Sequence, residues 1–254
     1  MKGLIQKFYL CFVYFLLYFP VLVLIFYSIN NTKYSLQWHG FSLHWYFELF
    51  NDHDLWHAFF HSIFLGICAS FIATTMGVFA CIRLLISRQQ HRSFQAVLLL
   101  LIIIPDIVFG VALLIFFNYS GIPLGFISLL IAHITLCLPF VIFSLISRIH
   151  TIDPNIYFSA LDLGASHYIA LSRILLPLLW PAILSALLLS FTLSFDDVII
   201  SYFIAGPDFN ILPLTIYSLV RAGVTPELNA LCTITIALSM ILVIISHKLT
   251  RTRP

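Results

Sequence analysis

Three acidic side chains interrupt long apolar stretches of the sequence, at Asp106, Asp196 and Asp197. An ionisable side chain in a membrane-spanning segment costs roughly 2.5–3.5 kcal/mol to insert and is a functional candidate by default. None of these stretches carries Lys or Arg near its middle. Acids without nearby cations favour a cationic ligand that arrives from outside the chain. Three alternatives stay open, namely pairing with a partner subunit, hydrogen bonding to neighbouring hydroxyls, and proton transfer.

Hydroxyl side chains accompany two of these acids. At spacings of four, three and four residues, one helical face carries Ser190, Ser194, Asp197 and Ser201. A shorter second row joins Thr192 to Asp196. A polar stripe on an otherwise apolar helix is predicted to face a water-filled path.

The third acid, Asp106, follows Pro105 and lies 12 residues beyond Phe94. A helix that rises 1.5 Å per residue would carry it about 18 Å into a membrane, which predicts a position near the middle. Proline bends a helix and frees a backbone carbonyl at such a point.

An aromatic group, Trp38, Trp45 and Tyr46, follows the first apolar stretch. Aromatic faces attract ammonium groups by about 0.5–2 kcal/mol, but aromatic side chains also gather at membrane–water interfaces. The interfacial interpretation is favoured for Trp38, and both stay open for Trp45.

Patterns typical of enzymes are incomplete. His57 and His61 have the spacing of a zinc site but lack the Glu of a HExxH motif, and no phosphate-binding loop occurs in the sequence. The five cysteines lie in apolar stretches without metal-ligand spacing. We therefore expect no catalytic residue, no metal site and no ATP site on this chain.

The composition predicts the environment of these residues. Of 254 residues, 61% are hydrophobic and 9% are charged, against roughly 25% charged in average globular proteins. Such a chain cannot be a soluble enzyme or a disordered chain, and a net charge of +2 offers no electrostatic footprint for nucleic acid. Its solvent is the lipid bilayer.

A spanning helix needs roughly 20 mostly apolar residues. Six stretches qualify, at about 8–30, 57–83, 94–118, 125–147, 178–204 and 228–248. With a cytoplasmic N-terminus, 10 of the 12 cations fall on one side, leaving Lys33 and Arg221 on the other. The sequence predicts a single all-α, multi-pass membrane domain over 1–254, with both termini cytoplasmic.

The longest cytoplasmic connection, 149–177, is patterned. Asp153 and Pro154 are typical of a helix start, and Gly164 of a helix end. Ser166 can cap a second helix, which Pro177 is expected to end or redirect.

This loop resembles the cytoplasmic motif of ABC-importer permeases, Glu-Ala-Ala, three residues, Gly, nine residues, Ile-x-Leu-Pro. Its anchors match at Ala160, Gly164, Ile174, Leu176 and Pro177. Phe158 and Ser159 replace the motif's Glu and first Ala. The resemblance implies a type I (MetI-like) importer fold, and a loop, begun by Asp153, that docks on a separate ATPase.

Several segments are similar to the spermidine/putrescine permease family, at 105–108, 190–201, 206–207, 211–214 and 225–231. That resemblance implies a polyamine cargo and a cation path. By matching position, the path takes in Asp106, Ser194, Asp196, Asp197 and, less securely, Trp45.

The resemblance also implies an assembly in the bacterial inner membrane. Its other members are a second homologous permease, two ATPase subunits that bind ATP and magnesium, and a periplasmic polyamine-binding protein. The rival interpretations are a permease for another cation, such as ferric iron, a stand-alone proton-coupled carrier, and a structural membrane anchor.

Overall fold

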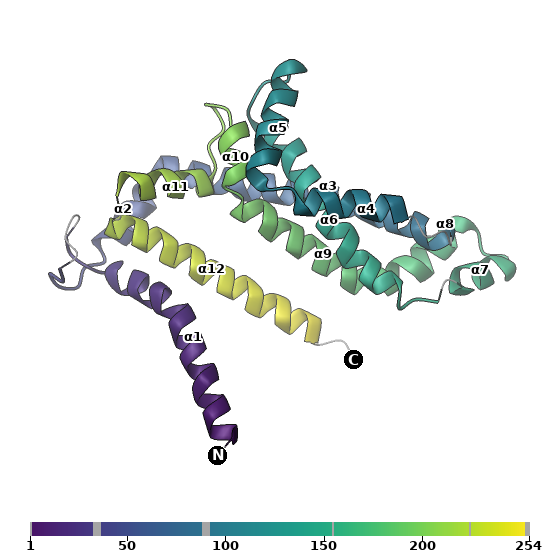
Figure 1. The fold of residues 1–254 in the computed structure, drawn as a ribbon, viewed down its shortest axis with the longest axis horizontal. Helices are drawn as coiled ribbons and strands as arrows, with labels where there is room; N and C mark the ends of the chain where they lie inside the picture. The colour runs from purple at the N-terminus through teal and green to yellow at the C-terminus, as the bar shows by residue number, and fades with distance from the viewer. Residues whose placement is uncertain (1, 33–36, 88–91, 154, 224, 252–254) are drawn as a thin grey trace. The chain divides into compact units, whose positions relative to one another are not determined.

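A computed structural model describes residues 2–32, 37–87, 92–153, 155–223 and 225–251 (Figure 1). Over these residues the chain is helical, with one isolated β-bridge between Asn30 and Phe41 and no strand. The helices are α1 Lys2–Tyr27, α2 His44–Asn51, α3 His53–Ser87, α4 Arg92–Ile103, α5 Asp106–Tyr119, α6 Phe126–Ile149, α7 Asn155–Asp162, α8 His167–Ile169, a π-helical segment Ala170–Leu175, α9 Leu176–Asp196, α10 Ile199–Ile204, α11 Leu212–Ala222 and α12 Pro226–Arg251. The predicted all-α class is confirmed.

Four helices in the described residues are long and apolar enough to cross a membrane. They are Gln6–Tyr27, His53–Ser87, Phe126–Ile149 and the continuous stretch His167–Asp196. The pair α4 and α5 meets the same test as a fifth, broken span. The sixth span, at 228–248, and the sides of the termini stay predictions.

The chain folds into two compact units, residues 1–56 with 215–254, and residues 57–214. In the first, α12 packs against α1 and α2, and Trp45 and Leu49 of α2 are buried. The long apolar side chains of α1 are exposed, as expected of a helix in lipid. The single transmembrane domain over 1–254 stays a prediction.

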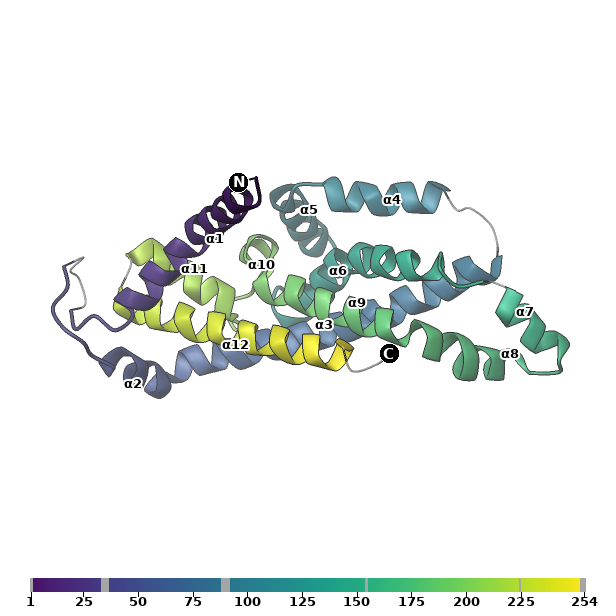
Figure 2. The ribbon, with the colours of Figure 1, turned by 90° about the horizontal axis from the view of Figure 1, so that it is seen from below.

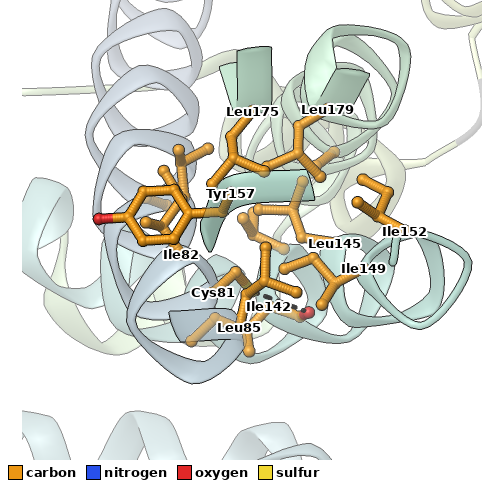
Figure 3. Packing of buried hydrophobic residues seen from close by; sticks show 14 of the residues in the cluster. Cys81, Ile82, Leu85, Ile142, Leu145, Ile149, Ile152, Tyr157, Leu175 and Leu179 are labelled. Atoms are coloured by element: carbon orange, nitrogen blue, oxygen red, sulfur yellow. Dashed lines mark hydrogen bonds between the residues drawn. The ribbon is translucent and has the colours of Figure 1, made fainter. Parts of the chain in front are cut away.

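The second unit is built on α6, which packs along α9 (Figure 2). One apolar cluster joins α3, α6 and α9 and continues into the loop 149–177 through Tyr157 and Ala160 of α7 (Figure 3). Gly77 allows α3 to approach α6 closely, since a Cβ there would lie 2.5 Å from Val141 Cγ1. The loop is therefore anchored to the helices that would cross the membrane.

A second apolar cluster surrounds the short helix α10. Ile200 and Ile204 of α10 are buried together with Phe117 of α5 and Leu129 of α6. Gly110 lets α5 and α10 touch, because a Cβ at Gly110 would lie 2.9 Å from the Phe203 ring of α10. Helix α10 thus lies between α5 and α6.

The chain breaks at Pro105. Helix α4 ends at Ile103, α5 begins at Asp106, and the two axes are bent by 102° (Figure 2). Pro105 has no backbone N–H to donate and restricts Ile104 before it. The predicted bend at Pro105 is therefore present, as a full break between two helices, and the position of Asp106 near the middle of the membrane stays a prediction. Asp106 stands in the first turn of α5, where the helix dipole favours a negative charge.

Candidate transport site and docking loop

The predicted fifth span, 178–204, is interrupted within its polar segment. Helix α9 ends at Asp196, and Asp197 is extended, with ψ at 122°. The Asp197 carboxylate turns onto the start of α10, where it accepts hydrogen bonds from the amides of Ile200, at 3.3 Å, and Ser201, at 2.8 Å. Asp197 thus satisfies backbone donors that a helix start leaves unpaired.

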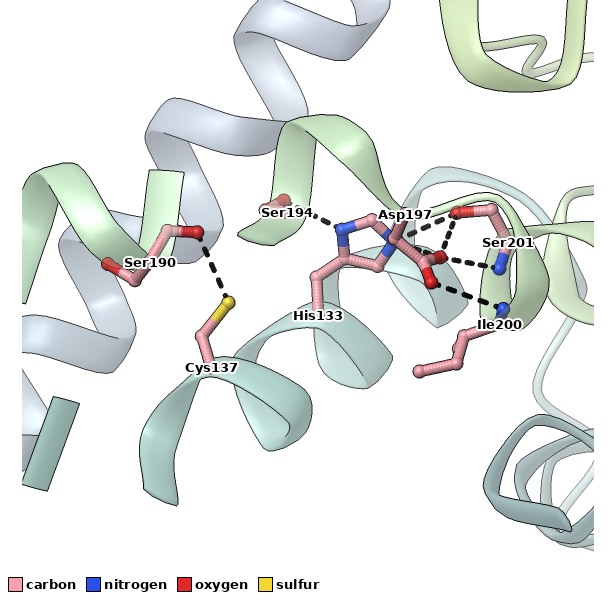
Figure 4. Close-up of polar contacts among 7 residues, drawn as sticks. All are labelled: His133, Cys137, Ser190, Ser194, Asp197, Ile200 and Ser201. Carbon is pink, nitrogen blue, oxygen red and sulfur yellow. Dashed lines mark hydrogen bonds and ion pairs between the residues drawn. The ribbon is translucent and has the colours of Figure 1, made fainter. Parts of the chain in front are cut away.

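A histidine of α6 completes this cluster (Figure 4). His133 is fully buried, with Nδ1 2.7 Å from the Ser194 hydroxyl and Nε2 3.0 Å from the Ser201 hydroxyl. Its Nε2 is also 3.6 Å from an Asp197 carboxylate oxygen. One imidazole therefore bonds the last turn of α9 and the body of α10, on either side of the break.

The donor and the acceptor of each hydrogen bond in this cluster can be assigned from its geometry. The Ser201 hydroxyl donates to Asp197 at 2.7 Å, so it can accept from His133 Nε2–H. His133 Nδ1 then accepts from the Ser194 hydroxyl. The result is a single chain, from Ser194 through His133 and Ser201 to Asp197, in which each hydroxyl and each ring nitrogen has a partner.

The first polar row is consequently buried. The side chains of Ser190, Ser194 and Ser201 are at most 3% exposed, and that of Asp197 is 7% exposed. The expectation that this row faces an open path is wrong in this structure, because the row meets His133 and Cys137 of α6 instead. Sequence analysis missed His133, although an imidazole in the middle of an apolar stretch was a signal.

The second polar row lies on the outside of α9. Asp196 and Thr192 are exposed, and the Thr192 hydroxyl is bonded to its own helix at Leu188 O. Asp106 is also exposed, at the start of α5. Of the predicted path residues in the second unit, Asp106 and Asp196 are thus the exposed ones.

Trp45 belongs to the other unit and is only 6% exposed. Its indole N–H donates to Asn30 O at 2.8 Å, and the neighbouring Tyr46 hydroxyl lies 2.7 Å from that of Ser28. Trp45 therefore secures the segment that follows α1. The ring contacts within its own unit leave it little free surface for an ammonium group.

The described residues hold no cluster of three or more His, Cys, Asp or Glu suited to a metal ion. His61, half of the pair that resembled a zinc site, has Nδ1 3.0 Å from Asn210 O and stacks on Phe209 at 4.2 Å. Its contacts are those of a packing residue.

In the predicted docking loop, 149–177, α7 ends as the sequence predicts. Gly164 has φ at +89°, a conformation in which glycine has no steric penalty. The Gly164 amide donates to Leu161 O at 2.9 Å and the Ala165 amide to Ala160 O at 3.0 Å, which together form a Schellman motif. At the start of α7, Asp153 accepts from the Asn155 amide at 2.9 Å, and Pro154 lies outside the described residues.

Pro177 does not end the second loop helix, contrary to one expectation. Helix α8, which Ser166 caps through the Ile169 amide, continues through the π-helical segment into α9. In that segment the Leu176 amide donates five residues back, to Leu171 O. This wider turn, close to the start of α9, accommodates a residue that has no N–H to donate.

Other apolar side chains of the loop divide between the core and the surface. Ile174 and Leu176 pack against the α3–α6–α9 cluster, as does Phe158 in place of the motif's Glu. Leu163 and Tyr168 are 89% and 78% exposed. The Tyr157 hydroxyl, 2.7 Å from His167 Nδ1, ties α7 to α8, a contact that sequence analysis did not foresee. The loop thus presents apolar side chains on a fixed frame.

Comparison with known proteins assigns the chain to a family. A family model described as "Binding-protein-dependent transport system inner membrane component" matches residues 73–253. The chain belongs to this family. It is therefore a membrane permease subunit, and the family assignment from the loop motif is confirmed.

Its relatives extend the match over nearly the whole chain. A Haemophilus influenzae protein named "Spermidine/putrescine transport system permease protein PotC" is 47% identical over 94% of this chain and 93% of its own length. Its namesake in Escherichia coli strain K12 is 42% identical over 94% of this chain and 91% of its own length. "Putrescine transport system permease protein PotI" of that strain is 36% identical over 86% and 80%.

Solved structures share the fold. A chain of a bacterial ABC transporter "involved in the import of the acidic polysaccharide alginate" has a TM-score of 0.76 at 16% identity, over 97% of this chain and 95% of that one. A chain of the MetNI methionine ABC transporter has a TM-score of 0.61 at 14% identity, over 80% and 100%. The predicted type I importer permease fold is confirmed.

Proposed function

We propose that this chain is one permease subunit of an ATP-driven importer of spermidine or putrescine in a bacterial inner membrane. The observation that carries the proposal is the 47% identity, over 94% of the chain, to a relative that bears the spermidine/putrescine name. The fold alone does not decide the cargo, because an importer of an acidic polysaccharide shares it.

The acids support a cationic cargo. Asp106 and Asp196 are exposed on two helices of the same unit, on a chain with a charged fraction of only 9%. A polyamine carries several ammonium groups along a flexible chain, so it can meet acids that stand apart. The exposed acids would replace part of the water around each ammonium group as it crosses the bilayer.

Energy would enter through the docking loop. The loop helix and α9 form one 30-residue helix from His167 to Asp196, about 45 Å long at 1.5 Å per residue. A displacement of the loop by a closing ATPase dimer would therefore be carried along a single rod to Asp196. No bond is made or broken on this chain in such a mechanism.

The assembly would hold a second homologous permease, two ATPase subunits and a periplasmic polyamine-binding protein. ATP and its magnesium ion would be bound by the ATPase subunits. The exposed Leu163 and Tyr168 of the loop would enter a groove on one of them.

The test is uptake of radiolabelled spermidine and putrescine into vesicles that contain the complete complex. We expect uptake to require ATP and the ATPase subunits, and to stop with a non-hydrolysable ATP analogue. Uptake driven by a proton gradient in vesicles without the ATPase would instead support the stand-alone carrier. ATP-dependent uptake of ferric iron, unaffected by excess spermidine, would replace the cargo but keep the importer.

A further inference from the structure

The cluster around His133 lies at the point where two adjacent acids of the predicted path differ in exposure. Asp196 and Asp197 are adjacent in sequence, yet Asp196 is exposed and the Asp197 side chain is 7% exposed. The difference arises at the break between α9 and α10, where Asp197 turns back onto the amides of Ile200 and Ser201. Because Asp196 is the last residue of α9, whatever holds this break also holds the end of the helix that carries Asp196.

His133 is the residue that spans the break from another helix. It lies 2.7 Å from the Ser194 hydroxyl, on the last turn of α9, and 3.0 Å from the Ser201 hydroxyl, on α10. Ser201 in turn donates to Asp197. A second contact from α6, Ser128 Oγ to Ile204 O at 3.4 Å, holds the far end of α10. Helix α6 therefore contacts α10 at Ser201 and at its last residue, and α9 at its last turn.

We propose that His133 is a positioning residue for transport, which holds the α9–α10 break so that Asp196 is presented to the cargo while Asp197 stays inside the protein. The proposal rests on the proposed function, in that Asp196 is taken as a ligand of the cationic cargo. His133 touches no cargo in this scheme. It acts through Ser194 and Ser201, and its two ring nitrogens are what allow one side chain to bond both.

The test is a double-mutant cycle in the complete complex, with His133→Leu and Asp196→Asn as the two changes. Loss of the two imidazole hydrogen bonds is expected to lower the cargo moved per ATP hydrolysed by about tenfold. If His133 acts through Asp196, the double variant falls no further than the lower single variant. If instead the losses of the two single variants multiply, so that the double variant moves about a hundredfold less cargo per ATP hydrolysed, the proposal is overturned and His133 is a packing residue.

Two further variants guard against a folding defect. His133→Gln keeps a donor and an acceptor and is expected to recover most of the coupling, whereas the nearby Thr135→Val, which removes a hydroxyl bonded only along its own helix at Ile131 O, should leave it unchanged. A loss in His133→Gln as deep as in His133→Leu would contradict the proposal, as would a loss in Thr135→Val of the same depth.

Amide hydrogen exchange separates this inference from the proposed function. In His133→Leu the amides of Ile200 and Ser201, which Asp197 caps, should exchange at least about tenfold faster than in the unaltered complex. If the unaltered complex moves no polyamine, the proposed function fails, but the exchange rates still show whether His133 holds the α9–α10 break. Unchanged exchange in His133→Leu would overturn the proposed role of His133 even where polyamine uptake is robust.

Discussion

Replacement of Gly164 by Ala tests the left-handed turn that ends α7 in the predicted docking loop, here called the elbow. The residue has φ at +89°, and a Cβ there would meet nothing within 4 Å, so the substitution adds backbone strain without a clash. An L-residue in the left-handed region costs roughly 1–2 kcal/mol. If the ATPase binds only the loop with its Schellman elbow formed, the same free energy is lost from docking, a weakening of about 5–30-fold.

The matched control is Gly121→Ala. Gly121 also has a positive φ, +67°, and open space around a Cβ, but it lies in the turn between α5 and α6. Both variants should lower thermal stability by similar amounts. Only Gly164→Ala should weaken the ATPase, measured as the dissociation constant of the ATPase for the detergent-solubilised permease pair.

A third variant sets the upper limit of the effect. Gly164→Pro forces φ to about −65° and removes the amide that donates to Leu161 O, so it should abolish co-purification of the ATPase. Equal ATPase affinity for the unaltered chain and Gly164→Ala would refute the reasoning. So would an equal loss in Gly121→Ala, since that result would trace the weakening to general instability.

Three further predictions concern the helices of the second unit. Asp106→Asn and Asp196→Asn should each cut uptake while the complex still assembles, because each removes an exposed charge and keeps the shape of the side chain. Normal uptake in both would mean that these acids do not bind the cargo. Asp197→Ala should lower the free energy of unfolding by about 0.5–2 kcal/mol through loss of a helix cap, whereas Asp196→Ala should not, as thermal denaturation in detergent can compare. Gly110→Ala should destabilise by about 1–3 kcal/mol, because its Cβ would lie 2.9 Å from the Phe203 ring, and an unchanged melting temperature would show that α5 and α10 can move apart.

The helix ends of the predicted docking loop could be predicted well because their signals are local. A left-handed Gly164 and a capping Ser166 each act within one turn of helix, so the sequence around them is enough. Pro177 was harder, since proline fits either after a helix or within its first turn. The π-helical turn before it decides between the two, and no local pattern marks that turn, whose last residue, Leu175, is buried in the core.

The transport site was harder because its partners are distant in sequence. The spacing that places Ser190, Ser194 and Asp197 on one face of a continuous helix says nothing about what that face meets. His133 lies 61 residues before Ser194, and no local pattern links them. The break after Asp196 also changes the spacing, so that the row extrapolated to Ser201 runs through two helices joined at a turn.

The two adjacent acids differ in what offsets the cost of their charge. Asp197 sits at the start of α10, where two amides and a hydroxyl donate to it and the helix dipole favours its charge. Asp196 is exposed at the end of α9, a helix that is otherwise mostly apolar. A carboxylate in that position costs free energy in a bilayer until a cation or water meets it. A cargo that carries its own positive charges supplies that compensation only while it passes, which is what a transport site requires.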